Sequence, residues 1–252
     1  MISMIKTILA GLNEVKVDRR KKYIMCLDVE TAGNIGSPLV YDMGFAVTDR
    51  KGNIYQKFSF VIEEIFDNKK LMDTAHYASK IPFYLQDLEE GKAIKCKFLE
   101  MREVFLKCLE VYNIDMVSAY NLNFDMRALR TTTEKLYGKG KRFLTSEYKD
   151  IDLMCIWSFA CEVLYSRPSF INFIDKHNLM TEKGNPLTNA EVGYRYISGD
   201  LEFKEAHRGL QDVEIECQIL AKCFAQRKKH ESGILPNPWN IVAKYNKDKK
   251  EI

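Results

Sequence analysis

Tyr23-Ile24-Met25-Cys26-Leu27-Asp28-Val29-Glu30 is the stretch that decides the fold, because an apolar run ends there in two carboxylates. The apolar part, which follows basic residues at 19–22, is typical of a buried strand. Residues i and i+2 of a strand face the same side, so Asp28 and Glu30 should project together. Two neighbouring negative charges beside a buried strand are costly unless a cation compensates them. A polar strand end that faces water is the structural alternative.

The segments that follow predict the rest of a sheet. A second apolar run extends from Val40 to Val47, and Lys51-Gly52-Asn53 predicts a hairpin turn into a strand from Ile54 to Ile62. Short connections indicate that the first three strands are antiparallel. Further strands are expected at 116–120 and near 149–153, and helices at 98–112, 124–137 and 209–226. These elements predict an α/β fold, a mixed sheet of three antiparallel strands and then parallel strands, flanked by helices.

Length and composition are those of a folded protein. The chain has 252 residues, 46% hydrophobic and 29% charged, enough for one large domain or two small ones. The formal net charge of +3 neither demands nor excludes a nucleic-acid partner. The seven cysteines form no Cys-x-x-Cys pair and are odd in number, which argues against structural zinc and a disulfide framework. We therefore expect reduced, mostly buried thiols in a cytoplasmic protein.

The two ends of the chain are expected to differ from its middle. No apolar run reaches about eighteen residues, so no membrane span is expected. Residues 4–12 predict a short amphipathic helix rather than a signal peptide. We divide the chain into an N-terminal helical extension at 1–21, a main domain at 22–226 and a basic tail at 227–252 on the surface. The polar segment at 64–95 matches no element that the sequence pattern identifies.

A second acidic motif follows the strand expected at 116–120. The stretch from Ser118 to Asp125 runs from the strand end into a helix, with Asn121 and Phe124 ahead of the acid. Asp is among the preferred N-cap residues of helices, so a cap is the structural alternative for Asp125.

His207 and Asp212 form a third motif near the end of the main domain. The two residues are five positions apart, so on one continuous helix they would point about 140° away from each other. To share a site, His207 should lie in the loop or first turn and Asp212 inside the helix. A solvent-exposed histidine beside a helix start is the structural alternative.

The three motifs together resemble the DEDDh (DnaQ-like) 3′–5′ exonucleases over roughly residues 22 to 226. Asp-x-Glu after the first strand, Asn-x-x-Phe-Asp in the middle and His-x-x-x-x-Asp near the end occur in the family's order. The sister subgroup has a tyrosine four residues before the last aspartate, where this chain has Arg208. Gly209 stands where the family often has alanine, and we expect it to loosen the helix start. The resemblance implies a ribonuclease-H-like fold and an exonuclease domain at 22–226.

The resemblance also implies the residues of the site. The metal ligands would be Asp28, Glu30, Asp125 and Asp212. They would hold two Mg²⁺ or Mn²⁺ ions, which prefer oxygen ligands, and Asp28 would bridge both. His207 would be the general base. The pocket for the terminal nucleotide would be formed by Thr31, Ala32, Asn121 and Phe124.

The function implied is hydrolysis of phosphodiester bonds in single-stranded DNA or RNA from the 3′ end, or in short oligonucleotides, releasing nucleoside 5′-monophosphates. A catalytically silent module that binds nucleic acid or a partner with the same fold is the alternative. A silent relative should have lost a ligand, and here all four acids and the histidine are present. A polymerase or replication partner cannot be read from the sequence.

Other charged groups have simpler interpretations. Asp150 and Asp152 form another i, i+2 pair, which we rank below Asp28 and Glu30 as a pair that ends a strand or supports the metal ligands from outside. Asp87, Glu89 and Glu90 are expected to be a solvated acidic face. A basic loop that could hold backbone phosphate, or simply aid solubility, contains Lys139, Lys141 and Arg142.

Overall fold

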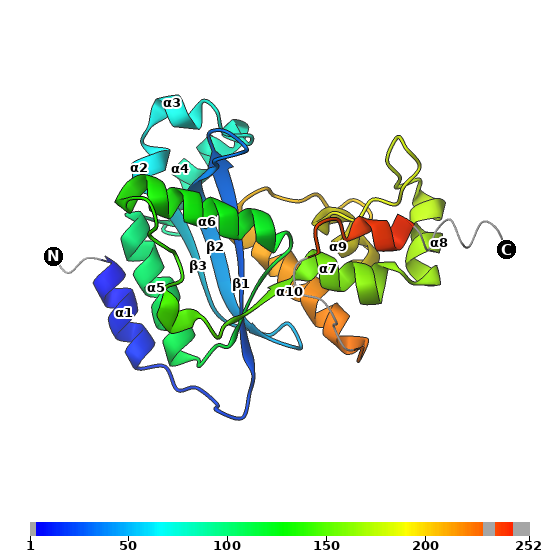
Figure 1. The fold of residues 1–252 in the computed structure, drawn as a ribbon, viewed down its shortest axis with the longest axis horizontal. Helices are drawn as coiled ribbons and strands as arrows, with labels where there is room; N and C mark the ends of the chain where they lie inside the picture. The colour runs from blue at the N-terminus through cyan, green and yellow to red at the C-terminus, as the bar shows by residue number, and fades with distance from the viewer. Residues whose placement is uncertain (1–3, 229–234, 244–252) are drawn as a thin grey trace.

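A six-stranded mixed sheet forms the centre of the molecule. The computed structural model describes residues 4–228 and 235–243. The strand order is β4-β3-β2-β1-β5-β6 (Figure 1). The strands are β1 (Tyr23–Ala32), β2 (Leu39–Asp49), β3 (Ile54–Ile62), β4 (Ile94–Cys96), β5 (Met116–Ala119) and β6 (Asp152–Cys155). β1, β2 and β3 pair antiparallel, β5 is parallel to β1, and β6 is parallel to β5, so the predicted mixed sheet is confirmed.

Helices cover both faces of the sheet. Figure 1 shows α1, α5 and α6 grouped at the left of the molecule and α7, α8 and α9 at the right. The longer helices are α1 (Met4–Asn13), α4 (Ile81–Glu89), α5 (Phe98–Val111), α6 (Leu122–Tyr137), α8 (Pro168–His177), α9 (Ala190–Ser198) and α10 (Gly209–Ala225). The shorter ones are α2 (Glu63–Phe66), α3 (Lys69–Met72), η1 (Ala78–Lys80), η2 (Ser146–Tyr148), α7 (Ile156–Ala160) and the π-helical turn η3 (Cys161–Tyr165).

Successive side chains of β1 point alternately into two hydrophobic cores, one on each face of the sheet. Met25 and Leu27 belong to the core shared with α1, α5 and α6. Ile24 and Cys26 belong to the core shared with α7 to α10. Because side chains alternate along a strand, the even-numbered positions that follow face α10. The two carboxylates of β1, Asp28 and Glu30, therefore face the helix that carries the third motif.

The predicted helices and strands are confirmed with small shifts. α5 and α10 match the expected ranges within one residue, and α6 begins at Leu122, two residues early. The strand expected near 149–153 was misplaced, since β6 spans Asp152–Cys155 and Asp150 lies in a turn. The segment 64–95 contains short helices and ends in β4, whose pairing with β3 extends the sheet by an edge strand.

The ends of the chain contribute to the cores. Ile5 and Leu12 of α1 are buried against the core that contains α5. The tail was expected on the surface, but Val242 is fully buried in the core beside α7 to α10. Of the basic tail, residues 229–234 and 244–252 lie outside the described residues, Lys229 among them. No helix in the described part of the chain is long and apolar enough to cross a membrane. All seven cysteines are free and buried.

Candidate active site

The first part of the site lies where β1 and β2 run side by side. Glu30 pairs in register with Asp42 of β2, and the register shifts after Glu30. Asp42 is 1% exposed and accepts hydrogen bonds from the Tyr84 hydroxyl and the Gly209 backbone NH, both at 2.8 Å. The hydrogen bond from Gly209 to Asp42 therefore links β2 directly to the start of α10.

The start of α10 positions His207 and Asp212. His207 precedes the helix in a left-handed backbone conformation with φ of 53°, and Asp212 lies in the first turn. The Asp212 carboxylate accepts a hydrogen bond from the Arg208 backbone NH at 2.8 Å. The predicted arrangement, with the histidine in the loop and the aspartate in the helix, is confirmed.

A pair of glycines lets α10 lie directly on β2. A Cβ added to Gly44 would lie 2.1 Å from the backbone nitrogen of Leu210. A Cβ added to Gly209 would lie 2.5 Å from the backbone nitrogen of Gly44. The expectation that Gly209 loosens the helix start was wrong, because the glycine permits a close backbone contact instead.

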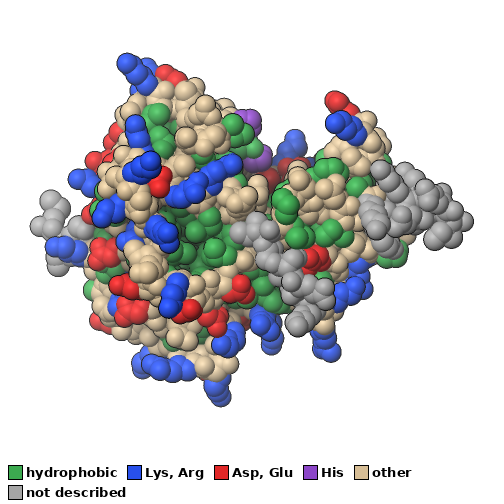
Figure 2. All heavy atoms as spheres, in the orientation of Figure 1, with side chains coloured by type: hydrophobic (Ala, Val, Ile, Leu, Met, Phe, Trp, Pro, Cys, Tyr) green, Lys and Arg blue, Asp and Glu red, His purple; other side chains and the backbone are tan. Residues whose placement is uncertain are grey.

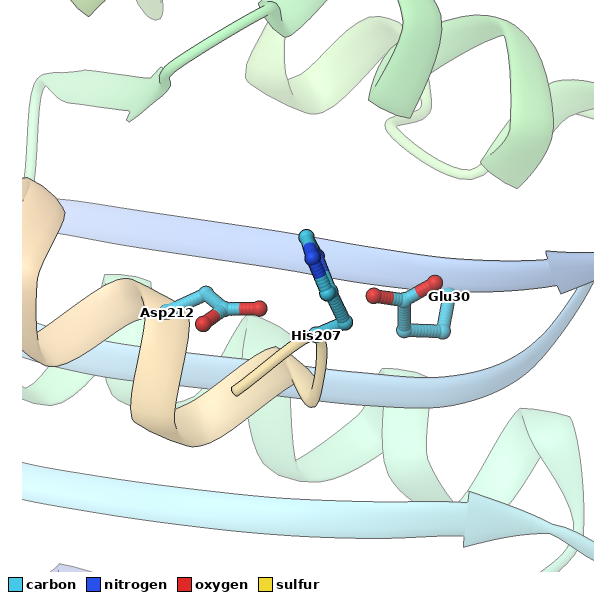
Figure 3. Close-up of side chains that lie close together, drawn as sticks. All are labelled: Glu30, His207 and Asp212. Atoms are coloured by element: carbon cyan, nitrogen blue, oxygen red, sulfur yellow. The ribbon is translucent and has the colours of Figure 1, made fainter. Parts of the chain in front are cut away.

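Glu30, His207 and Asp212 converge on one point. Each offers one ligand atom, and these atoms all lie within 4.8 Å of one another. Figure 3 shows the carboxylates of Glu30 and Asp212 pointing toward each other, with the His207 ring between them in this view. Glu30 of a strand thus meets His207 of a loop and Asp212 of a helix, although it is far from both in the sequence.

Asp125 lines the same cavity from α6, on the other side of β1 from α10. It is buried in the first turn of α6 and accepts a hydrogen bond from the backbone NH of Val29 at 3.3 Å. The N-cap position of α6 is occupied by Asn121, so the alternative in which Asp125 caps the helix does not hold. Asp28 and Asp125 line the cavity together with the other three site residues.

The cavity has a volume of about 630 Å³. Of the residues expected to hold the terminal nucleotide, Thr31, Asn121 and Phe124 line it. Ala32 is not among the lining residues and is instead 1% exposed in the core against α5 and α6. For the side chain of Ala32 the expectation is therefore not met.

The carboxylates carry strongly raised pKa values. Burial raises the pKa of Asp125 and that of Asp212 to about 7 each. Burial, with repulsion from Asp42 and Asp212, raises the pKa of Glu30 to about 9. Burial and the charges of Glu216 and Asp125 raise the pKa of Asp28 well above its usual range. So many crowded, poorly solvated carboxylates fit a bound divalent cation, whose charge would offset their repulsion.

His207 sits between aromatic and cationic neighbours. Its ring stacks on Tyr77, with centroids 4.1 Å apart and planes 8° apart. Desolvation, followed by the charge of Lys80, lowers the pKa of His207 below its usual 6.5. The imidazole is therefore neutral near pH 7, the form that can accept a proton.

Sequence reasoning missed several residues of the cavity wall. Tyr77 and His76 come from the segment at 64–95, which has no periodic pattern. Glu205 also lines the cavity, and burial raises its pKa to about 8. Glu216 is 2% exposed and accepts a hydrogen bond from the Tyr120 backbone NH at 3.3 Å. An acid four residues after Asp212 on the apolar face of the predicted helix was the signal available for Glu216.

The competing acidic groups lie elsewhere or act differently. Asp150 and Asp152 line a separate pocket with Lys22 and Arg50, away from the candidate ligands. Asp87 was expected to be solvated, but it is 8% exposed and forms an ion pair with Arg208, next to His207. The pairing explains the burial, because a buried charge needs a partner. Glu89 and Glu90 are exposed as expected.

Comparisons with known proteins identify the fold. No family model and no curated protein matches the chain. It is similar to a zinc-bound complex of E. coli exonuclease I with single-stranded DNA, with TM-score 0.54 and 15% identity over 82% of this chain and 41% of that one. It is also similar to E. coli exonuclease I in complex with a 5cy-dT13 oligonucleotide, with TM-score 0.53 and 15% identity over 87% and 42%.

The match spans about two fifths of those exonuclease chains. At this identity the likeness shows the fold alone. Together with the six-stranded sheet, it establishes that the chain has a ribonuclease-H-like fold.

Proposed function

We propose that the chain is a metal-dependent 3′–5′ exonuclease of the DEDDh type. It would hydrolyse phosphodiester bonds of single-stranded DNA or RNA and release nucleoside 5′-monophosphates. The observation that carries the proposal is the convergence of Glu30, His207 and Asp212 to within 4.8 Å, in one cavity with Asp28 and Asp125. The exonuclease I structures with the same fold contain single-stranded DNA, which supports a substrate of that kind.

Asp28, Glu30, Asp125 and Asp212 would hold the two Mg²⁺ or Mn²⁺ ions, because hard cations prefer carboxylate oxygens. Bound ions would neutralise charge on the phosphoryl oxygens and help to activate water. A neutral His207 would take the proton of the attacking water at its free ring nitrogen. Thr31, Asn121 and Phe124 would orient the terminal nucleotide from the cavity wall, with Phe124 beside its base or sugar.

The free, buried cysteines support a reducing compartment, and we propose a cytoplasmic location. The silent binding module has no observation in its favour, because each of the five site residues lines the cavity. The assay below distinguishes DNA from RNA as the substrate.

The test is degradation of end-labelled single-stranded DNA and RNA with Mn²⁺ or with a chelator. Wild type should give a metal-dependent ladder that shortens from the 3′ end. Asp28→Ala should lower the rate by more than about a hundredfold, since outer-shell changes near metals already cost about 10–100-fold.

Asp152→Ala is the matched control, because Asp152 is an exposed acid outside the cavity. It should cleave like wild type. Equal rates for Asp28→Ala and wild type would contradict the site, and no cleavage of either polymer by wild type would favour a very small substrate or the silent module.

A further inference from the structure

A second cleft lies beside the candidate active site on α6. It has a volume of about 440 Å³. Its lining combines three arginines and Asn123 with apolar side chains. The residues that matter are Arg127, Arg130, Arg142, Met126, Phe143 and Leu144. Figure 2 shows Lys and Arg side chains gathered around hydrophobic ones on the face that α6 crosses.

The cleft and the active-site cavity are both lined by residues at the start of α6. Phe124 lines the active-site cavity, and the guanidinium of Arg127 lies over its ring, 5.5 Å from the centroid. Arg127 and Arg130 follow Phe124 in steps of three residues, so the three side chains form a row that winds around the helix by about 120°. From Phe124 to Arg130 the helix rises about 9 Å. A strand whose end lies at Phe124 could therefore continue along this row.

The arginines of the cleft, Arg127, Arg130 and Arg142, form no ion pair with a carboxylate of the described residues, 4–228 and 235–243. Within the same ranges, Nε of Arg127 is buried and has no hydrogen-bond partner. The charge of Arg127 is therefore not neutralised by a carboxylate of the described residues, and an anion bound in the cleft would neutralise it.

The loop that carries Arg142 is held in place. The next residue, Phe143, is 3% exposed, and its carbonyl oxygen accepts a hydrogen bond from Nε of Arg102 at 2.6 Å. Arg142 is itself exposed at the edge of the cleft. A fixed loop opposite a helix provides a preorganised site, which lowers the entropic cost of binding.

We propose that this cleft binds the sugar-phosphate backbone of a single-stranded nucleic acid, at the nucleotides that precede the one in the active site. Guanidinium groups bind phosphate through paired hydrogen bonds, and apolar side chains support sugars and bases. A uniformly acidic peptide would leave the apolar side chains of the cleft without a contact. The direction of the strand rests on the proposed exonuclease function, whereas the binding itself does not.

The test measures binding of labelled single-stranded oligonucleotides in chelator, where no hydrolysis occurs, at several salt concentrations. The double variant Arg130→Ala/Arg142→Ala should weaken binding of a long oligonucleotide by on the order of tenfold. Its salt slope should fall by roughly 1.4, because each single-strand phosphate contact contributes about 0.7. The loss should be larger for a long oligonucleotide than for a dinucleotide.

Two variants sharpen the result. Lys51→Ala/Lys222→Ala removes the same number of charges from exposed residues at the other end of α10, so it should bind like wild type. Arg130→Lys/Arg142→Lys keeps the charge but loses the planar fork, so its affinity should be intermediate. Thermal denaturation confirms that each variant is folded.

Wild-type affinity and salt slope in Arg130→Ala/Arg142→Ala would overturn the proposal, even if the enzyme cleaves DNA. Equal binding of polyglutamate and oligonucleotide through the cleft would also overturn it, in favour of an acidic peptide. If wild type binds through these arginines but cleaves nothing, the exonuclease function fails and the binding site stands.

Discussion

The ring of His207 stacks on that of Tyr77, with centroids 4.1 Å apart and planes 8° apart. The two residues come from distant parts of the chain, Tyr77 from the segment after α3 and His207 from the loop before α10. The stack fixes the plane of the imidazole and helps to exclude water from it. In the proposed reaction Tyr77 is therefore a positioning residue for the general base.

Two substitutions of Tyr77 should distinguish the contribution of its ring to kcat from that of its hydroxyl. Tyr77→Phe keeps the stack and should retain near wild-type kcat. Tyr77→Ala should lower kcat by about tenfold, and it should move the low-pH limb upward, because less desolvation raises the pKa of His207 toward 6.5. The pH profile of kcat measures both effects. If Tyr77→Ala behaves like Tyr77→Phe in rate and in profile, the stack has no positioning role.

The activity should depend on the neutral form of His207. The pKa of His207 is lowered by desolvation and by Lys80. Under saturating Mn²⁺, kcat should therefore rise with pH, with the midpoint of the rise below 6.5, and then level off. His207→Gln should lower kcat by about 10²–10⁴-fold, the usual contribution of a general base. It should also remove this limb from the profile. A flat wild-type profile from about pH 5.5 to 8 would count against the role.

The metal-free protein should lose stability as the pH rises. Folding raises the pKa of Asp125 and Asp212 to about 7 and that of Glu30 to about 9, whereas unfolded carboxylates titrate near 4. The folded state then holds protons that the unfolded state releases. The resulting stabilisation is complete below about pH 4 and is lost as the pH rises through about 7 to 9.

Thermal unfolding in chelator should show a Tm that falls from about pH 5 to about pH 9. Asp28→Asn should flatten that dependence, because it removes one of the crowded charges. Mn²⁺ should raise the Tm most at high pH. Asp152→Asn, an exposed acid outside the cavity, should keep the wild-type profile. A Tm that rises with pH in chelator would show that the carboxylates are compensated within the protein.

The glycine contact between β2 and α10 should tolerate no side chain. Gly44→Ala places its Cβ 2.1 Å from the backbone nitrogen of Leu210, and backbone cannot rotate away. We expect a loss of at least about 1–3 kcal/mol in the free energy of unfolding. Gly209→Ala should behave similarly and also weaken the proposed metal site, because the first turn of α10 carries the proposed ligand Asp212. Denaturant titration measures the loss.

Gly11→Ala is the control for that experiment. Gly11 lies on an exposed position of α1, where an added Cβ meets nothing within 4 Å. It should gain about 0.5–1 kcal/mol, the usual advantage of alanine over glycine in a helix. An unchanged free energy of unfolding in Gly44→Ala would mean that α10 can shift away from the sheet.

Strong local patterns were enough to predict the three antiparallel strands, β5 and three main helices. The apolar run before Asp28 predicts β1, and helical spacing predicts α5 and α10 within a residue. The segment at 64–95 could not be predicted, because short helices carry too few turns for a periodic pattern. β6 was shifted because its apolar residues continue directly into α7.

The sequence by itself determined which side chains were candidates for the site. It also determined that Asp28 and Glu30 share one face of β1, because strand alternation is a local property. The tertiary structure decided what surrounds them. Only the crossing of Gly44 and Gly209 brings Asp212 to β1, and only the folded 64–95 segment brings Tyr77 to His207. Burial of Glu216 and Asp87 likewise depends on packing between distant segments, which no local spacing records.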